Sequence, residues 1–243
     1  MDRTITINSD LGESIGIHSF GNDDELISIV DTVNVACGMH AGDPGSMEQV
    51  VRSAAAAGIT IGAHPGLPDI AGFGRRAMML DEEDVRDLVR YQVGALVAFL
   101  EAHHLALDHI KPHGALFAMT AKDDKLMRSI CNVARQYQVP VFGIAGTSHE
   151  RIASAEGVDF VSEFYVDLEY DDEGMVIVER RPAASDLDIV TRRARDAIRN
   201  GTLTTRSGAT RSAVFDSICV HSDLPQAAAV ARVVRSELTA VRL

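Results

Sequence analysis

The sequence predicts a parallel α/β fold, and three observations support that prediction. Short runs rich in β-branched residues alternate with helical stretches along the chain, as in strands joined by crossover helices. Apolar residues make up 46% of the chain and aromatic residues only 5%, which suits a core of Ala, Val, Ile and Leu between a sheet and its helices. A length of 243 residues fits one α/β barrel domain over residues 1–243.

The apolar runs predict seven strands. These are Thr4–Asn8, Thr32–Ala36, Ile59–Ala63, Leu107–Lys111, Val139–Ile144, Asp159–Ser162 and Ser217–His221. Helices are expected between them. The clearest is Asp81–His104, where apolar residues recur at helical spacing behind an acidic first turn.

Two further segments have recognisable ends. A helix over Pro44–Ala57 has Pro in its first turn and is followed by Gly58, which is the usual asymmetry of helix termini. The acidic run Asp167–Glu173, followed by Gly174 and an apolar stretch Met175–Val178, predicts a solvated hairpin inserted after the sixth strand.

Charge and cysteine content exclude several classes of protein. The formal net charge of -12 repels polyanions, which argues against nucleic-acid binding. The first residues show no secretory signal and no apolar run approaches the ~20 residues that span a bilayer, so we expect a cytoplasmic protein. Cys37, Cys131 and Cys219 have no Cys-x-x-Cys spacing and are predicted to be free thiols, with Cys131 in the core.

Polar or glycine-containing segments follow every predicted strand. Because the carboxyl ends of parallel strands meet at one face, these segments are predicted to converge on one site. The residues concerned are Asn8, Asp10, Glu13, Asn34, Cys37, His40, Gly42, Asp43, His64, Asp69, Lys111, His113, Gly146, Glu163, His221 and Asp223. Exposed loops are polar in most proteins, but that explains four His and a Lys less well than a convergent site does. The remaining histidines are predicted to be surface or helix-end residues: His18, His103, His104, His109 and His149.

The residue types leave the chemistry of this site open. Carboxylate and imidazole suit Zn, Mn or Ni, so Asp10, His64 and His113 are candidate metal ligands, with His40 of the same type. An acid/base and hydrogen-bonding constellation without a permanent metal is the favoured interpretation. Cys37 with His40 is a less favoured nucleophile and base pair, because their spacing does not ensure that the side chains meet.

Lys111 lies between Ile110 and Pro112 at a strand end, so its ammonium is expected to be partly desolvated. Two functional roles are open: orienting an anionic substrate or phosphate, or acting near neutral pH with a lowered pKa. A buried structural ion pair is the alternative to both.

The segments that carry these residues resemble the LamB/YcsF family in the same order over nearly the whole chain. They are Asn8–Glu13, Asn34–Asp43, Gly62–Pro65, Gly72–Arg76, Lys111–Leu116 and Cys219–His221. The resemblance implies a seven-stranded β/α barrel, TIM-like and of the glycoside hydrolase/deacetylase type. It also implies the A component of a 5-oxoprolinase, which converts 5-oxoproline to glutamate at the expense of ATP together with B and C partner subunits.

The sequence is compatible with an enzyme in which partner subunits take part in the reaction with ATP. It has no G-x-x-x-x-G-K-[ST] phosphate loop, so contacts to ATP and its Mg are expected to depend on the partners. A bound divalent metal and a homo-oligomer both remain open.

The chemistry of lactam opening assigns roles to the residues at the strand exits. Asp10 or Glu13 would activate water, Lys111 and N–H groups near Gly42 and Asp43 would stabilise negative charge, and His64 or His113 would protonate the leaving nitrogen. His40 completes the predicted catalytic group. The predicted substrate-binding residues are Asn8, Asn34, Gly42, Asp43, Glu163, His221 and Asp223.

Three positions depart from the family pattern and bear on the substrate. Leu168 stands where the family has Arg, Ser222 where it has Gly, and Phe117 where it has Tyr. Arg180 or Arg181 is a candidate to replace the missing guanidinium. A metal-dependent deacetylase or amidohydrolase acting on another small amide is therefore an alternative, and a non-catalytic substrate-binding subunit is a third interpretation.

Overall fold

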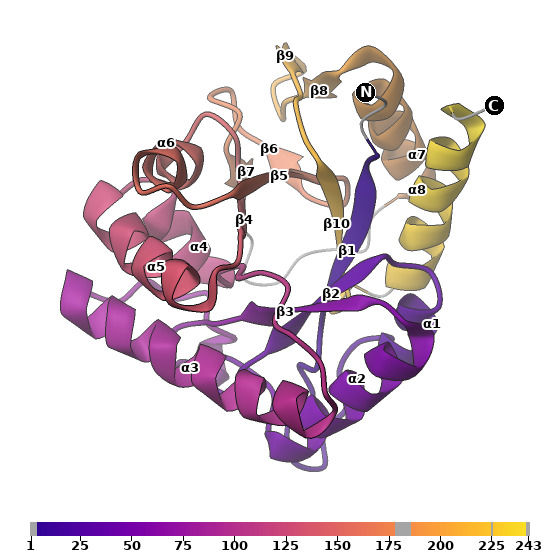
Figure 1. Ribbon diagram of the computed structural model, residues 1–243. Helices are drawn as coiled ribbons and strands as arrows, with labels where there is room; N and C mark the ends of the chain where they lie inside the picture. Colours follow the sequence, from indigo (N-terminus) through magenta and orange to yellow (C-terminus); the bar gives the residue numbers. More distant parts are fainter. Residues whose placement is uncertain (1–3, 178–185, 225, 242–243) are drawn as a thin grey trace.

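The computed structural model describes residues 4–177, 186–224 and 226–241, and six parallel strands form its central sheet (Figure 1). Their spatial order is β3-β2-β1-β10-β5-β4. The strands are β1 Thr6–Leu11, β2 Thr32–Ala36, β3 Thr60–His64, β4 Val141–Gly143, β5 Phe160–Tyr165 and β10 Ser217–His221. Two short antiparallel pairs lie outside this sheet: β6 Glu169–Tyr170 with β7 Val176–Ile177, and β8 Thr202–Thr204 with β9 Thr210–Ser212.

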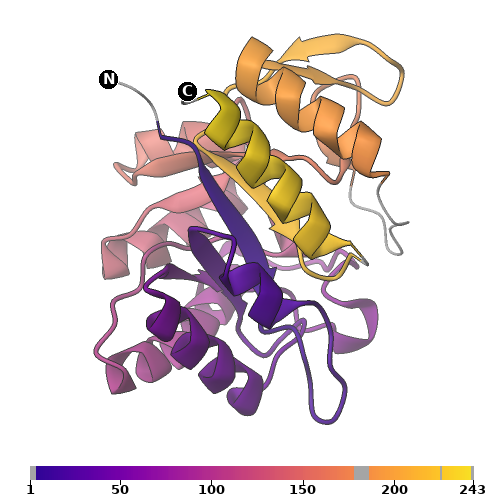
Figure 2. The same ribbon diagram turned by 90° about the vertical axis from the view of Figure 1, so that its right-hand side faces the viewer.

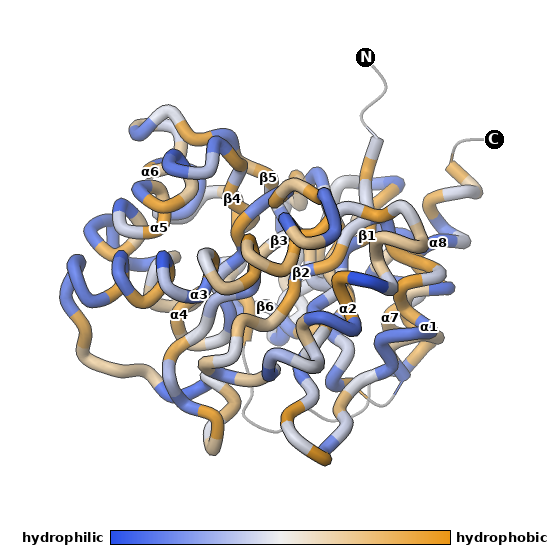
Figure 3. The backbone as a smooth tube through the Cα atoms, turned by 60° about the horizontal axis from the view of Figure 1, so that its bottom comes forward, coloured by the Kyte–Doolittle hydropathy of each residue, from blue (hydrophilic) through white to orange (hydrophobic). Residues whose placement is uncertain are grey.

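Helices surround the sheet, and Figure 2 shows α7 and α8 side by side at one end of it. The helices are α1 Asp23–Ile27, α2 Pro44–Ala57, α3 Glu82–Ala102, α4 Gly114–Thr120, α5 Asp124–Tyr137, α6 Ser148–Ala155, α7 Leu187–Arg195 and α8 Ala227–Val241, with a 3-10 turn Ile70–Gly72 and a π-helical turn Asp196–Asn200 after α7. Apolar colouring gathers on the central strands and hydrophilic residues on the outer helices (Figure 3). Within the described ranges, no helix has the length and apolar character needed to cross a membrane.

The segment Leu107–Lys111, predicted as the fourth strand, is not a strand of this sheet. Ile110 forms single parallel bridges to Ala63 of β3 and Val141 of β4. The Lys111 N–H donates to the Ala63 carbonyl at 2.9 Å, and the Ile110 N–H donates to the Pro140 carbonyl at 3.0 Å. Proline has no N–H, so Pro140 and Pro112 limit a longer ladder between this segment and β4. The described sheet therefore has six strands, and the prediction of seven is not confirmed.

The predicted helix ends agree with the structure because local side chains determine them. Asp43 accepts a hydrogen bond from Ser46 N at the start of α2, and Gly58 ends that helix with a left-handed φ of 70°. Asp81 caps α3 by accepting from the N–H groups of Glu83 and Asp84. The predicted bounds of β2 and β10 are also those observed.

The acidic hairpin is less solvated than the sequence indicates. The β6–β7 pair turns at Gly174, and Asp172 and Glu173 at its tip are exposed. At its base, however, Asp167 is only 7% exposed, and Tyr170 is buried with its ring stacked on Phe164. The prediction of a solvated hairpin tip over Asp167–Glu173 is therefore confirmed for Asp172 and Glu173 and wrong for the base of the hairpin. Residue 178, the last of the predicted strand, lies outside the described residues.

Alternate residues of the strands point into the interior and support one another there. Gly62 of β3 lies against His109, whose Nε2 bonds Asn34 Oδ1 of β2. A methyl group on Gly62 would lie 2.2 Å from that Nε2. Because Asn34 in turn donates to Asp10, this close contact of backbone and ring helps to position the carboxylate.

Gly62→Ala is expected to destabilise the protein by about 1–3 kcal/mol, because a buried ring or strand must move to admit the methyl group. Gly94→Ala in α3 is the matched control: its nearest new neighbour would be Tyr137 Oη at 3.7 Å, which is ordinary contact. Removing a helix-interior glycine should stabilise by about 0.5–1 kcal/mol. Urea unfolding of both variants measures the difference, and equal midpoints would show that the interior accommodates the methyl group freely.

Candidate functional site

Asp10 lies at the centre of a buried polar network at the carboxyl end of β1. Its Oδ1 accepts from Lys111 Nζ at 2.8 Å and from Asn34 Nδ2 at 2.7 Å. Its Oδ2 lies 3.4 Å from His64 Nε2 and 3.8 Å from His221 Nε2. Burial tends to raise the pKa of Asp10, but His64 and Lys111 outweigh it and hold the pKa well below its usual value. Asp10 is therefore a carboxylate at neutral pH.

Lys111 is 2% exposed and surrounded by anionic or polarisable groups. Besides Asp10, its Nζ lies 3.0 Å from Cys219 Sγ and 3.3 Å from a Glu163 oxygen. Burial alone would lower the pKa of the ammonium, but Asp10, Cys219 and Glu163 raise it well above its usual value. The predicted role with a lowered pKa is therefore wrong, and the structure supports the buried ion pair.

Three histidines from three different elements meet beside Asp10. His40 and His113 are stacked, with ring centroids 3.7 Å apart and planes 7° from parallel. His64 Nε2 lies 2.9 Å from His113 Nδ1. Burial lowers the pKa of His40 and of His113 well below the usual value, so both rings are neutral. The convergence predicted from the strand exits thus brings Asp10, His40, His64 and His113 together.

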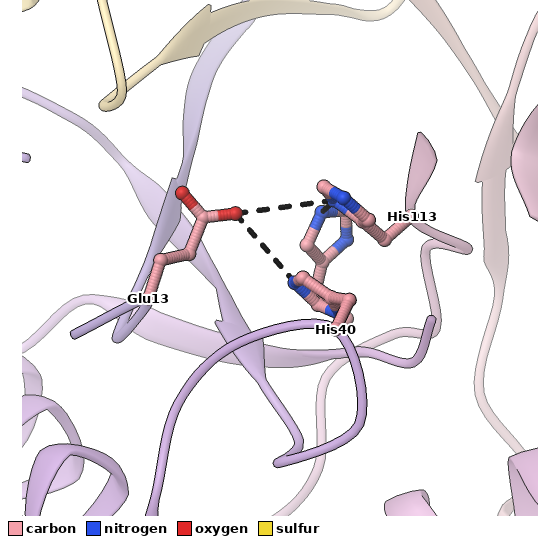
Figure 4. A group of neighbouring side chains, drawn as sticks. Glu13, His40 and His113 are labelled. Atoms are coloured by element: carbon pink, nitrogen blue, oxygen red, sulfur yellow. Dashed lines mark hydrogen bonds and ion pairs between the residues drawn. The ribbon is translucent and has the colours of Figure 1, made fainter. Parts of the chain in front are cut away.

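Glu13 faces these histidines from the loop after β1. Its Oε1 lies 3.6 Å from His40 Nε2 and 3.9 Å from His113 Nδ1, and Figure 4 shows the carboxylate directed at the two rings. Ser222, at one of the positions that depart from the family pattern, donates to Glu13 Oε2 at 3.3 Å. Burial, then Asp223 and Asp10, raise the pKa of Glu13 well above its usual value.

His40 is the least satisfied member of the group. Its ring is fully buried, yet neither of its nitrogens has a hydrogen-bond partner among the described residues. A buried polar atom without a partner costs about 1–3 kcal/mol. Two glycines allow the backbone to pack closely against the ring. A methyl group on Gly66 would lie 2.4 Å from His40 Nδ1, and one on Gly74 would lie 2.6 Å from His40 Cβ.

A small cavity opens beside this network. Its polar residues include Asp10, His64, Lys111, His113 and His221, together with the ion pair of Arg75 and Asp223, whose Nη2 and Oδ2 are 2.8 Å apart. The rest of the wall is mostly apolar and is formed by Pro112, Gly114, Phe117, Tyr165, Leu168, Val176 and Leu224. The cavity therefore offers a charged side and an apolar side to a small molecule.

His221 differs from His40 and His113 in its charge. Burial tends to lower the pKa of His221, but Asp167, with Oδ1 3.0 Å from Nδ1, more than offsets it, so the pKa is raised to about 9. His221 is therefore protonated at neutral pH and carries a proton next to the cavity.

Several predicted substrate-binding residues lie elsewhere. Asn8 and Asn34 are fully buried beneath Asp10, where Asn34 Nδ2 donates to Asn8 Oδ1 at 2.8 Å. Glu163 accepts a hydrogen bond from the Tyr165 hydroxyl at 2.8 Å, and its Oε1 forms an ion pair with Lys111 Nζ at 3.3 Å. These three side chains position the network and do not form the cavity wall.

Gly42 and Asp43 also lie away from the cavity. Asp43 caps α2, and its other carboxylate oxygen accepts from Gly16 N at 2.6 Å. A methyl group on Gly42 would lie 2.7 Å from the Gly12 carbonyl oxygen, so this glycine packs against the loop after β1. Gly42 and Asp43 are therefore not part of the cavity wall, and the start of α2 is used for packing and capping.

Further sequence-based assignments need correction. The Cys37 thiol donates to the Val35 carbonyl at 3.1 Å, and burial raises its pKa to about 12, so it does not serve as a nucleophile. His109 is fully buried and is not a surface or helix-end residue, whereas His149 lies in the first turn of α6, as predicted for a helix end, but is also fully buried. Cys131 is a core residue, as predicted.

The alternation of side chains along strands is the signal that could have found the missed residues. His109 is two residues from Lys111, and Cys219 and Tyr165 are each two residues from a predicted site residue, His221 and Glu163 respectively. Residues at i and i+2 share one face of an extended segment, so each belongs to the same interior face as a residue already identified. Arg75 and Asp167 come from loops, where no such periodicity applies.

Comparison with known proteins agrees with this arrangement. The model of the LamB/YcsF family matches residues 5–243. The A subunit of 5-oxoprolinase from Bordetella pertussis is 40% identical over 242 residues, covering 98% of this chain and 96% of that protein. The lactam utilization protein lamB of Emericella nidulans is 40% identical over 223 residues, covering 90% and 88%. The crystal structure of a lactam utilization protein from Thermus thermophilus matches with a TM-score of 0.90 at 37% identity, covering 98% and 97%.

The fold and the site define an α/β protein with a buried acid, base and cation constellation at the carboxyl ends of parallel strands, where enzymes of this architecture bind their substrates. Within that class, the chain belongs to the LamB/YcsF family.

Proposed function

We propose that this protein is the A subunit of an ATP-dependent 5-oxoprolinase and that its cavity binds the cyclic amide that is opened. The names of its relatives support this assignment, since proteins about 40% identical are named as the A subunit of 5-oxoprolinase or as a lactam utilization protein. The observation that carries it is the buried pair of Asp10 and Lys111, with the half-buried His221 beside it, at the wall of a small cavity.

The residues of this cavity suit the opening of a lactam. A lactam carbonyl is stabilised by resonance, so it must be activated before water attacks, and phosphorylation of the amide oxygen by ATP would do so. Asp10 is held as a carboxylate and would orient or activate the water. His221 is protonated at neutral pH and would donate a proton to the nitrogen as the C–N bond breaks. In this role it replaces His64 and His113, the donors expected from the sequence.

Lys111 would act mainly by fixing Asp10. Its ammonium also borders the cavity, where it favours negative charge developing on the substrate. Partner subunits would supply the contacts to ATP and Mg, since the chain has no phosphate loop. The naming of the relatives as one subunit of an enzyme agrees with the involvement of partners.

The assay that tests this function measures 5-oxoproline-dependent ATP hydrolysis and glutamate formation by this chain with and without its B and C partners. We expect coupled turnover only when all are present. Amide hydrolysis by the chain alone without ATP would contradict the proposal and support the amidohydrolase alternative, for which the histidine cluster is the specific observation. Full turnover by the partners without this chain would contradict any catalytic role for it.

We also propose that the extended segment Leu107–Lys111 takes the place of a seventh strand and closes the sheet into a barrel. Ile110 is bridged to the two edge strands, β3 and β4. This would make the site the mouth of a closed β/α barrel, and would explain why Lys111 and His113 reach the same cavity as residues from β1 and β10.

A further inference from the structure

The cluster of Glu13, His40, His64 and His113 has the dimensions of a metal-binding site. One ligand atom from each lies within 4.8 Å of all the others. Four ligands placed tetrahedrally about 2.0–2.1 Å from a zinc ion are roughly 3.3–3.4 Å apart. The observed separations bracket that value: His64 Nε2 to His113 Nδ1 is 2.9 Å, His40 Nε2 to Glu13 Oε1 is 3.6 Å, and His113 Nδ1 to Glu13 Oε1 is 3.9 Å.

The outer nitrogens of two of these rings are oriented as in known metal sites. His64 Nδ1 lies 2.8 Å from the Lys111 carbonyl oxygen, and His113 Nε2 lies 2.8 Å from the Phe73 carbonyl oxygen. A carbonyl only accepts, so each outer nitrogen must carry a proton. In a neutral ring, the inner nitrogen then presents its lone pair. A histidine that binds a metal commonly donates its other N–H to a backbone carbonyl in this way.

The two inner nitrogens, His64 Nε2 and His113 Nδ1, face each other at 2.9 Å. Two lone pairs at that distance repel each other unless a proton or a metal lies near both. A shared proton would satisfy these two atoms, but it would leave His40 Nε2 without a partner in a fully buried position among the described residues. A metal ion satisfies all three nitrogens and can take the Glu13 carboxylate, which points at the rings, as a fourth ligand (Figure 4).

Glu13, and not Asp10, is the carboxylate best placed to complete this group. Asp10 Oδ1 already accepts from Lys111 and Asn34, and Asp10 Oδ2 lies between His64 Nε2 and His221 Nε2, at 3.4 and 3.8 Å. Glu13, in contrast, lies within 4.8 Å of all three histidines of the cluster. The neighbouring cluster of Asp10, Cys219 and His221 contains the Lys111 ammonium, which contacts both Asp10 and Cys219. A second cation there would be repelled at short range.

We propose that one divalent transition-metal cation binds to four side chains: Glu13, His40, His64 and His113. Three imidazoles, which are borderline ligands, and one carboxylate, which is a hard ligand, together suit zinc, and also manganese, iron or nickel. The site adjoins the substrate cavity, because His64 and His113 line both. It differs from the set of Asp10, His64 and His113 considered from the sequence, and it does not depend on the proposed reaction.

The first test measures metal binding by the wild-type protein without a histidine tag. The protein is stripped with a chelator, and Zn²⁺ is then titrated in competition with a chromogenic chelator. We expect one equivalent to bind and to remain after gel filtration, as measured by mass spectrometry of the metal. Less than about a tenth of an equivalent retained by folded protein would overturn the proposal, because a four-ligand site of this kind holds its metal tightly.

The second test identifies the ligands with nearly isosteric variants. Glu13→Gln and His40→Gln should each weaken Zn²⁺ binding by at least about tenfold, because each removes a ligand. Asp10→Asn should retain Zn²⁺ binding within a few-fold, and His149→Gln controls for the loss of a buried histidine outside the cluster. Circular dichroism checks that each variant is folded. Loss of binding in Asp10→Asn with retention in Glu13→Gln and His40→Gln would overturn the proposed ligand set.

X-ray absorption of the zinc-loaded wild-type protein provides a measurement that does not depend on whether the variants fold. Multiple scattering from imidazole should fit three histidines and one carboxylate in a four-coordinate site. A fit with two or fewer histidines would exclude His40 or another member of the cluster. None of these measurements uses activity, so failure of the metal proposal and failure of the proposed function are distinguishable.

Discussion

Lys111→Met is expected to lower the free energy of unfolding by about 3–5 kcal/mol and to abolish 5-oxoproline-dependent turnover. Methionine retains most of the side-chain volume but leaves Asp10 and Glu163 buried without their cation, and breaking a buried pair from one side has a cost of this size. Asp10 would then tend to take up a proton, because the ammonium is one of the two main groups that keep its pKa low. Urea unfolding and the coupled assay with the partner subunits measure the two effects.

Two further variants separate the ion pair from other effects of the substitution. Lys125→Met removes a lysine whose side chain is 72% exposed and 3.8 Å from Glu82, and it should change neither quantity appreciably. Combining Lys111→Met with Asp10→Asn should recover part of the lost stability, because both partners are then neutral. If Lys111→Met kept wild-type stability and lost only activity, the ammonium would be a group that acts on the substrate and not a structural partner of Asp10.

Helix ends could be predicted from the sequence because they depend on nearby residues. Asp43 and Gly58 bound α2 through a side-chain cap and a left-handed turn, and both interactions involve only residues within four positions. The end of β1 could not be predicted in this way. The strand continues to Leu11 although Ser9 and Asp10 are polar, because these side chains find partners on β10, β2 and Lys111, far away in the sequence.

The location of the candidate site could be predicted from the sequence, whereas the roles of its residues could not. Parallel strands bring their carboxyl ends together, so Asp10, His64 and Lys111 could be expected to meet. Whether Lys111 has a free or a paired ammonium depends on Glu163 and Cys219, which come from other strands. The N–H groups near Gly42 and Asp43 looked suitable for an anion, but the packing of Gly42 against Gly12 places them elsewhere.

Leu168 is the position at which the sequence and the structure together make a prediction about the substrate. The side chain lies in the cavity wall with Val176 and Leu224, and it does not project into solvent with the tip of the hairpin. Its own carbonyl accepts from Arg193 at 3.0 Å, which fixes the backbone here. Arg180 and Arg181, the candidates to replace a guanidinium at this position, lie outside the described residues.

Leu168→Arg is expected to raise kcat/KM for 5-oxoproline by roughly tenfold or more in the reconstituted enzyme. A guanidinium in the cavity wall could bind the substrate carboxylate through two parallel hydrogen bonds, and a hydrogen bond to a charged group contributes about 1.5–3 kcal/mol. Leu168→Met keeps the wall apolar and should leave kcat/KM within a few-fold of the wild-type value. Leu168→Lys should raise kcat/KM less than Leu168→Arg, because an ammonium cannot form the two parallel hydrogen bonds that a planar guanidinium forms with a carboxylate. Steady-state kinetics with 5-oxoproline and with a lactam that lacks the carboxylate would show whether the gain is selective. If Leu168→Arg changed the melting temperature but improved neither substrate, the guanidinium of the family would have a structural role, and the apolar wall of this cavity would not limit the binding of 5-oxoproline.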